Sequence, residues 1–356
     1  MKRATCLCLC GLFLYAAEPV KEVFDRAARA LAAADYPSAE RGFQSVLQTE
    51  PRNVAALSNL GVIYSRTSRA REAITCYRRA LQLSPSDAAL LLNLGLVYLR
   101  LEDHRRALPL FERVVAMNPA HLQARQLLAV CRAYAGQLKP AIRELETLRA
   151  ATPHDENIVF LLGFAYLKDH EADRAKAVFE TMFETAGPAR TEFLVGKANY
   201  EATLFPQAEA SFLRVIQIDP GYPGVRLELG KVYISLHRND EAILELQLAL
   251  KGKAGNEDAN YFLGSLLVQQ GRCAEAIAYL EQARKMKPDA WATYFHLGKA
   301  KLRLAQAAEA IPLLQRAAEL NPDESTVQYE LARAFQAEGK KPEAARAFRR
   351  AQELAR

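Results

Sequence analysis

Aromatic and basic residues recur four positions apart in the second half of this 356-residue chain. Phe193 precedes Lys197, and Phe295 precedes Lys299, each by four positions. Side chains with this spacing lie on one face of a helix, so each ring would lie beside its cation. Cations bind carboxylates and rings bury apolar surface, which favours binding of a peptide with acidic groups. The candidate residues of this pattern are Phe160, Phe193, Lys197, Lys231, Tyr261, Phe295, Lys299, Tyr329 and Arg333.

The same pattern also has a purely structural interpretation. The rings could pack against neighbouring helices while the cations stay in solvent, because long basic side chains often cover apolar surface in this way. Some of the cations could be neutralised by acidic residues at neighbouring positions of the pattern, namely Glu228, Asp258 and Glu330. Both interpretations remain open at the level of sequence.

The spacing belongs to a 34-residue period that covers the chain. Prolines fall at Pro51, Pro85, Pro119 and Pro153, each 34 residues after the last. A small residue follows the same period, and an alanine stands twelve positions after it each time. The small residues are Gly61, Gly95, Ala129, Gly163, Gly196, Gly230, Gly264, Gly298 and Ala332, with one spacing of 33 between Gly163 and Gly196.

Each period predicts two amphipathic helices. Leu57, Gly61 and Tyr64 share one face by their three- and four-residue spacing, and Ala73 and Tyr77 share a face of a second helix. A polar turn over 66–69 separates the two segments. The small residues predict a close helix crossing, beside which the tyrosines fill the remaining volume.

The pattern Leu-Gly-x-x-Tyr, then Ala-x-x-x-aromatic, then Pro resembles the tetratricopeptide repeat. It is complete at Leu60, Gly61, Tyr64, Ala73, Tyr77 and Pro85, and the chain carries nine such matches in register, this one included. The resemblance implies an all-α fold, a right-handed superhelical solenoid of antiparallel helix pairs with about ten repeats. It also implies that the first helix of each pair lines the concave face, where ligands of this family usually bind.

We place a single solenoid over residues 18–356. Arg125 and Arg132 in repeat 122–155 and Asn199 in repeat 189–222 depart from the pattern, and such departures mark candidate bends. The predicted repeats are 20–53, 54–87, 88–121, 122–155, 156–188, 189–222, 223–256, 257–290, 291–324 and 325–356.

Asn59 and Asn93 stand at the same position of two successive repeats. They resemble the middle asparagine of the carboxylate clamp in chaperone-binding members of the family, but the clamp's flanking cations are not in place. They also resemble the asparagine ladder of O-linked N-acetylglucosamine transferases, which here stops after two positions. The two amides either bind a peptide backbone or satisfy local hydrogen bonds.

The amino terminus predicts export. Lys2 and Arg3 precede an uncharged, mostly apolar run over 4–15, and the small residues Ala16 and Ala17 follow. This order is typical of a secretory signal peptide, here residues 1–17. We therefore expect a periplasmic or secreted protein, or a cytoplasmic one if the segment is not a signal. Cys76, Cys131 and Cys273 remain in the mature chain, in different phases, which predicts three separate thiols.

The repeats leave no segment for a catalytic domain. The chain has no glycine-rich phosphate loop, no H-E-x-x-H and no G-x-S-x-G, so we expect no enzyme, no catalytic residues, no metal and no cofactor. A net charge of +6 does not favour nucleic-acid binding. We expect a monomeric, exported, non-enzymatic scaffold that binds a peptide or partner segment in a concave groove. The alternatives are a non-catalytic targeting subunit of an envelope enzyme complex and a self-assembling structural protein.

Overall fold

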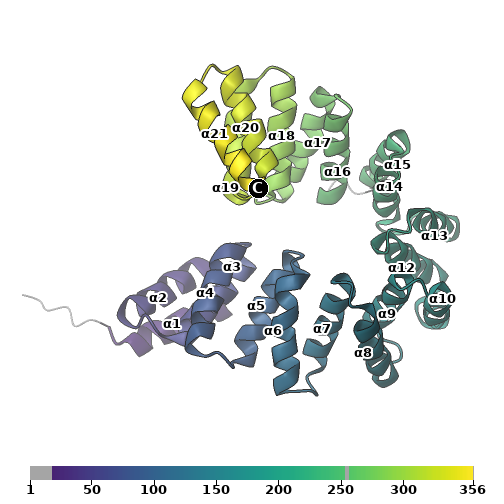
Figure 1. The fold of residues 1–356 in the computed structure, drawn as a ribbon, viewed down its shortest axis with the longest axis horizontal. Helices are drawn as coiled ribbons and strands as arrows, with labels where there is room; N and C mark the ends of the chain where they lie inside the picture. Colours follow the sequence, from purple (N-terminus) through teal and green to yellow (C-terminus); the bar gives the residue numbers. More distant parts are fainter. Residues whose placement is uncertain (1–17, 253–255, 356) are drawn as a thin grey trace, which may run out of the picture. The chain divides into compact units, whose positions relative to one another are not determined.

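A computed structural model describes residues 18–252 and 256–355, and helices joined by short turns make up this part of the chain (Figure 1). The predicted signal peptide, residues 1–17, lies outside the described residues. The described residues contain 21 helices and no strand, which confirms the predicted all-α class.

The helices follow the predicted repeats in pairs, with one repeat holding an additional short helix. Their bounds are α1 Val20–Ala32, α2 Tyr36–Thr49, α3 Val54–Arg66, α4 Ala70–Leu83, α5 Ala88–Arg100, α6 His104–Met117, α7 Leu122–Tyr134, α8 Leu138–Ala151, α9 Glu156–Lys168, α10 Ala172–Glu180, α11 Phe183–Ala186, α12 Pro188–Glu201, α13 Phe205–Ile218, α14 Val225–Ser235, α15 Asn239–Gly252, α16 Glu257–Gln269, α17 Cys273–Met286, α18 Trp291–Arg303, α19 Ala307–Leu320, α20 Ser325–Ala337 and α21 Lys341–Leu354.

Contacts divide the chain into two compact units. The N-terminal unit ends at Gln137, and the C-terminal unit begins at Leu138. The division falls inside repeat 122–155, which departs most from the repeat pattern in the sequence. The single solenoid over 18–356 stays a prediction. Within each unit, helices that follow one another pack together as antiparallel pairs, which is the arrangement of an α-solenoid.

The turn within each pair is three residues long, and its middle residue has a left-handed backbone. Ser68 has φ 59° and Glu102 has φ 57°, and glycine takes the same place at Gly136, Gly271 and Gly339. The chain then reverses at once: Arg69 N–H donates to the Tyr64 carbonyl at 2.8 Å. This closure satisfies carbonyls that the end of the first helix would otherwise leave without a partner.

The small residue of each period lies at the predicted helix crossing. A Cβ atom added to Gly95 would be 2.6 Å from the ring of Phe111, and one added to Gly61 would be 2.6 Å from the ring of Tyr77. Both rings are buried. In the later repeats the partner is a leucine, such as Leu246 opposite Gly230. The prediction that these positions allow close helix packing is confirmed.

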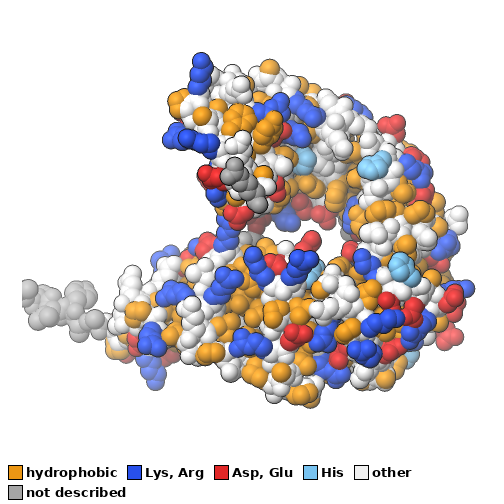
Figure 2. Space-filling view, viewed as in Figure 1, with side chains coloured by type: hydrophobic (Ala, Val, Ile, Leu, Met, Phe, Trp, Pro, Cys, Tyr) orange, Lys and Arg blue, Asp and Glu red, His pale blue; other side chains and the backbone are white. Residues whose placement is uncertain are grey.

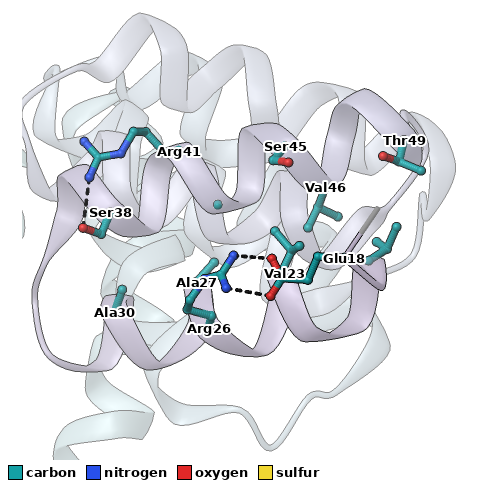
Figure 3. Close-up of a pocket in the computed structure, with 12 residues that line it drawn as sticks. Glu18, Val23, Arg26, Ala27, Ala30, Ser38, Arg41, Ser45, Val46 and Thr49 are labelled. Atoms are coloured by element: carbon teal, nitrogen blue, oxygen red, sulfur yellow. Dashed lines mark hydrogen bonds and ion pairs between the residues drawn. The ribbon is translucent and has the colours of Figure 1, made fainter. Parts of the chain in front are cut away.

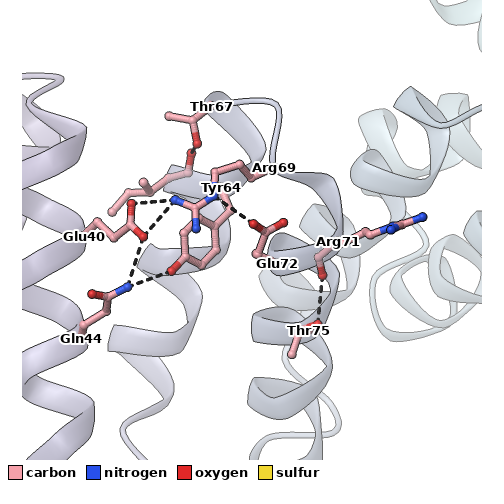
Figure 4. Close-up of polar contacts among 9 residues, drawn as sticks. Glu40, Gln44, Tyr64, Thr67, Arg69, Arg71, Glu72 and Thr75 are labelled. Atoms are coloured by element: carbon pink, nitrogen blue, oxygen red, sulfur yellow. Dashed lines mark hydrogen bonds and ion pairs between the residues drawn. The ribbon is translucent and has the colours of Figure 1, made fainter. Parts of the chain in front are cut away.

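Tyr64 shows how a first helix attaches to the preceding repeat (Figure 4). Gln44 of α2 donates to its hydroxyl at 3.2 Å, and the Arg69 guanidinium lies 4.3 Å from its ring centre. Arg69 also forms an ion pair with Glu40 of α2 at 2.9 Å. Tyr64 thus fills the space between two repeats and carries a polar contact across it.

Candidate functional site

Every candidate binding residue of the sequence pattern lies on a first helix. Asn59 and Asn93 are on α3 and α5 in the N-terminal unit, and the others are on α9, α12, α14, α16, α18 and α20 in the C-terminal unit. First helices of successive repeats contact one another, as α14, α16, α18 and α20 do, whereas no two second helices make a comparable contact among the described residues. We call the side on which the first helices approach one another the first-helix face.

Lys299 and Phe295 form the predicted stacked pair on α18. The Lys299 ammonium lies 5.7 Å from the centre of the Phe295 ring, within the range of a cation–π contact. Neither Lys299 nor Lys197 of α12 forms an ion pair with a carboxylate among the described residues, and both side chains are half-buried. These two ammonium groups are therefore available to an acidic ligand.

Two other candidate cations are neutralised by the chain itself. Lys231 lies 2.8 Å from the Glu228 carboxylate and 5.1 Å from the ring of Tyr200. Burial lowers the pKa of Lys231, but Glu228, together with Tyr200 and Asp258, more than offsets this, and the net pKa is raised. Arg333 donates to the buried Glu330 at 2.9 Å. Basic residues along this face therefore do not all attract an acidic ligand.

The candidate rings also differ in their roles. Phe193 packs against Phe212 and Tyr222 at centroid distances of 5.7 and 5.1 Å, so it supports the junction between α12, α13 and the following loop. Tyr329 touches Phe348 at one edge, yet 51% of it is exposed. Phe160 on α9 is half-buried. Tyr329 is consequently the most accessible of the candidate rings.

An aromatic cluster joins α16 and α18. We define it by Tyr261, Trp291, Phe295 and His296. The ring of His296 lies 5.8 Å from Tyr261 and 5.2 Å from Phe295, and Trp291 lies 6.2 Å from Phe295. Trp291 and His296 were not among the sequence candidates, because they do not stand at the two repeat positions that carry the ring and the cation of the pattern. A tryptophan one turn before Phe295 was the signal that could have revealed the cluster.

His296 is the titratable member of this cluster. Its Nδ1 is buried without a hydrogen-bond partner in the described part of the chain. Burial, and then the nearby Lys299 ammonium, lower the pKa of His296 to about 4. The imidazole is therefore neutral at physiological pH, where it acts as one more flat, weakly polar ring beside Tyr261 and Phe295.

Asn59 and Asn93 lie half-buried on α3 and α5. Within the residues that the structure describes, neither side chain makes a hydrogen bond. The local-bonding interpretation therefore has no contact to support it in this unit, and both amides can still donate and accept.

A hollow of about 530 Å³ lies between α1 and α2 (Figure 3). The Arg26 guanidinium binds the Glu18 carboxylate through two bonds of 2.6 and 2.7 Å at its edge, and Arg41 donates to Ser38 at 3.1 Å. Small side chains such as Ala30 line its floor. The two arginines are thus paired within the hollow, which the hydroxyl groups of Ser45 and Thr49 also line.

Other kinds of site receive no support from the described residues. Their His, Cys, Asp and Glu side chains form no cluster that could hold a metal ion, and no helix among them is both long and apolar enough to cross a membrane. Cys76, Cys131 and Cys273 are buried free thiols, as predicted, and burial raises the pKa of Cys131 to about 12. Basic and acidic side chains are interspersed over the visible surface of both units (Figure 2).

Comparison with known proteins agrees with the repeat pattern. Models of the tetratricopeptide repeat match residues 52–120 and 98–159, and a further one matches 227–291, 261–304 and 295–356. No curated protein matches the chain. Similar solved structures include one titled "Crystal structure of MamA protein", with 22% identity, a TM-score of 0.44, and coverage of 47% of this chain and 91% of that one. Another is MamA 41-end from Desulfovibrio magneticus RS-1, with 20% identity, a TM-score of 0.45, and coverage of 47% and 95%.

Proposed function

Since the chain belongs to the tetratricopeptide repeat family, whose arrays are protein-interaction scaffolds, we propose that it binds an extended segment of a partner protein along the first-helix face of its C-terminal unit. The observation that carries the proposal is the Lys299 ammonium over the Phe295 ring, beside the aromatic cluster and without a carboxylate partner. A cation left unpaired beside half-buried rings is suited to a ligand with both acidic and apolar groups.

The ion pairs within the chain sharpen the expected ligand. Lys231 and Arg333 are already bound to Glu228 and Glu330, so they contribute little net attraction. Lys197 and Lys299 remain to bind carboxylates. The ligand is therefore expected to carry acidic groups at separated positions, with apolar side chains between them that contact Tyr261, Phe295 and Tyr329.

The N-terminal unit contributes a second, smaller surface to the proposal. Asn59 and Asn93 come one repeat apart on first helices and keep their amides free of hydrogen bonds within the described residues. An amide that both donates and accepts can pair with a peptide backbone whatever its side chains are. We assign them to backbone binding, with no contribution to sequence preference.

Export is also part of the proposal, and it rests on residues 1–17. Their order of basic, apolar and small residues is that of a signal peptide. Cell fractionation combined with sequencing of the mature amino terminus tests this directly. A mature chain that begins near Glu18 in the periplasm or medium supports export, whereas an intact amino terminus in the cytoplasm contradicts it.

Affinity capture tests the binding function. The mature chain is used as bait in an extract of the native periplasm, and bound proteins are identified by mass spectrometry. A parallel bait carries Lys197→Ala, Phe295→Ala and Lys299→Ala, and a control bait carries Lys285→Ala on the second helix α17. The proposal expects a partner that the wild type and the control retain and the triple variant loses. A bait that retains nothing, or three baits that retain the same proteins, would contradict it.

A further inference from the structure

A second hollow, of about 330 Å³, lies in the C-terminal unit where α10, α11, α12 and α13 meet. This volume is at the lower end of the range of pockets that hold small ligands, roughly 300–1,000 Å³. Apolar side chains line most of it, namely Leu167, Ala175, Phe179, Phe183 and Val195. It is lined from the first helices α9 and α12 as well as from α10, α11 and α13, and none of its lining residues is a candidate residue of the first-helix face.

The hollow lies where a tyrosine of the repeat is missing. Asn199 stands three positions after Gly196, where other first helices carry Tyr64, Tyr98 and Tyr166. In those repeats the ring fills the space against the preceding second helix, as Tyr64 does against α2. The Asn199 side chain is shorter and bonds back to its own helix, since its Nδ2 donates to the Val195 carbonyl at 3.0 Å. The place of the ring is left open.

The neighbouring helices do not close the gap. α10 has nine residues, whereas the other second helices have fourteen. At the other junctions within the two units, each second helix packs against the next first helix, but here α12 packs mainly against α9 and only lightly against α10. The shortened α10 and the shifted contact of α12 leave Phe179 and Phe183 at the edge of unfilled space.

The hollow is lined by hydrogen-bond acceptors and donors: the carboxylates of Glu180 and Glu192 accept, whereas Lys176, which lies 3.8 Å from Glu180, and Arg214 donate. In the preceding repeat the Tyr166 hydroxyl donates to Glu146 at 2.5 Å, and the residue 34 positions after Glu146 is Glu180, at the rim of the hollow. The Glu192 carboxylate lies 2.9 Å from Arg214, yet its buried Oε2 has no aligned donor. Two carboxylates therefore line the space that corresponds to the place of the hydroxyl-bearing ring in the repeats of Tyr64, Tyr98 and Tyr166.

We propose that this hollow is a binding site for a tyrosine or tryptophan side chain of a partner protein. The ring would lie between Phe179 and Val195, in the place left by the absent tyrosine, and its O–H or N–H would donate to Glu180 or Glu192. The occupant follows from the repeat itself, because the chain fills the equivalent place with its own tyrosines in neighbouring repeats. The site does not depend on binding at the first-helix face.

The probe is p-cresol, the tyrosine side chain itself, titrated against the full chain by ligand-observed NMR. We expect saturable binding at one site, about tenfold tighter than that of 4-methylanisole, which has the same ring but cannot donate, because a hydrogen bond to a charged group is worth about that much. N-acetyltyrosinamide should bind as p-cresol does, since the ligand is a side chain on a backbone. If N-acetyltyrosinamide does not bind while p-cresol does, the assignment to a side chain of a protein partner is overturned.

Three variants locate the binding. Asn199→Tyr should fill the hollow from within, raise the melting temperature and abolish p-cresol binding. Asn157→Tyr makes the same change at an exposed position of α9 and should bind like the wild type. Should Asn199→Tyr fail to fold, Ala172→Phe at an exposed lining position gives the same test. Absence of p-cresol binding to the wild type, or wild-type binding in the folded hollow-filling variant, overturns the proposal.

Discussion

The Arg132 guanidinium donates to the Glu112 carboxylate at 3.2 Å, across the junction between α6 and α7. The two residues are twenty positions apart, which is also the separation of Tyr64 from Gln44 and of Tyr166 from Glu146. Arg132 thus makes the contact between repeats that a tyrosine makes elsewhere. In the sequence it stands out as a departure from the repeat, whereas in the structure it serves the same purpose with a longer, charged side chain.

The first prediction follows from this contact. Arg132→Ala should lower the free energy of unfolding by about 1–3 kcal/mol, because it removes the bond to Glu112 and the packing of a mostly buried side chain. Arg132→Tyr should retain most of the stability. Urea unfolding measures both, and Arg105→Ala, at an exposed position of α6, is the control. Equal losses in the alanine and tyrosine variants would show that the site does not accept the tyrosine of the repeat.

The helix crossing at Gly95 gives the second prediction. Gly95→Leu should be destabilising by about 1–3 kcal/mol or more, since even a Cβ atom there meets the buried Phe111 ring at 2.6 Å. Thermal unfolding measures the loss. Gly221→Ala, whose Cβ has its nearest neighbour at 3.5 Å, should change little. An unchanged melting curve for Gly95→Leu would refute the crossing.

The third prediction concerns how the free energy of unfolding depends on pH, and it rests on His296. Its pKa is about 4 in the folded chain and about 6.5 when unfolded, so the unfolded state takes up the proton first as the pH falls. Its contribution to stability is complete above about pH 6.5 and is lost as the pH falls to 4, by up to ~3 kcal/mol. The stability of His296→Phe should therefore decline less with acid than that of the wild type.

Parallel unfolding curves at a series of pH values test this assignment. His154→Gln, an exposed position in the same unit, should follow the wild type. Lys299→Met should raise the pKa of His296, since the ammonium is the second cause of the depression. NMR titration of the imidazole reads this pKa directly, and a His296 pKa near 6.5 in the wild type would contradict the buried, neutral ring.

Much of the fold could be predicted because it depends on local periodicity. The glycine period located the helix crossings, and the polar segment at 66–69 located a turn whose middle residue, Ser68, is left-handed. The shortening of α10 was not predicted, because the sequence of that helix keeps its apolar period through Phe179 and Met182. Its effect depends on how α12 packs against α9, which is a contact between repeats.

The candidate site was predictable only in part, for a similar reason. The four-residue spacing placed Phe295 and Lys299 on one helix face, and the ammonium lies over the ring in the structure. Phase alone could not determine whether Lys231 pairs with Glu228 or remains free, because that choice depends on side-chain rotamers and on Tyr200 from the preceding repeat. Trp291 and His296 were missed since they join the cluster through contacts between helices, outside the repeated phases.

The fourth prediction concerns charge at the first-helix face. Lys197→Ala combined with Lys299→Ala should chiefly slow association with the captured partner and reduce its dependence on salt, because unpaired charges at the edge of an interface steer encounter more than they hold the complex. Stopped-flow kinetics at several ionic strengths measure both quantities. Lys231→Ala, which removes a charge already paired with Glu228, should have the smaller effect on the association rate. A larger effect from Lys231 than from the unpaired lysines would contradict the assignment.

The most direct test of the proposed binding face is the affinity of the captured partner for Tyr329→Ala. This ring is half-exposed and packs only at its edge, so its loss should leave the fold intact. Calorimetry should show affinity weakened by about 1–2 kcal/mol, as for an aromatic contact at an interface, while Lys285→Ala on α17 binds like the wild type. Unchanged affinity for Tyr329→Ala together with lost affinity for Lys285→Ala would place binding on the second helices and contradict the account.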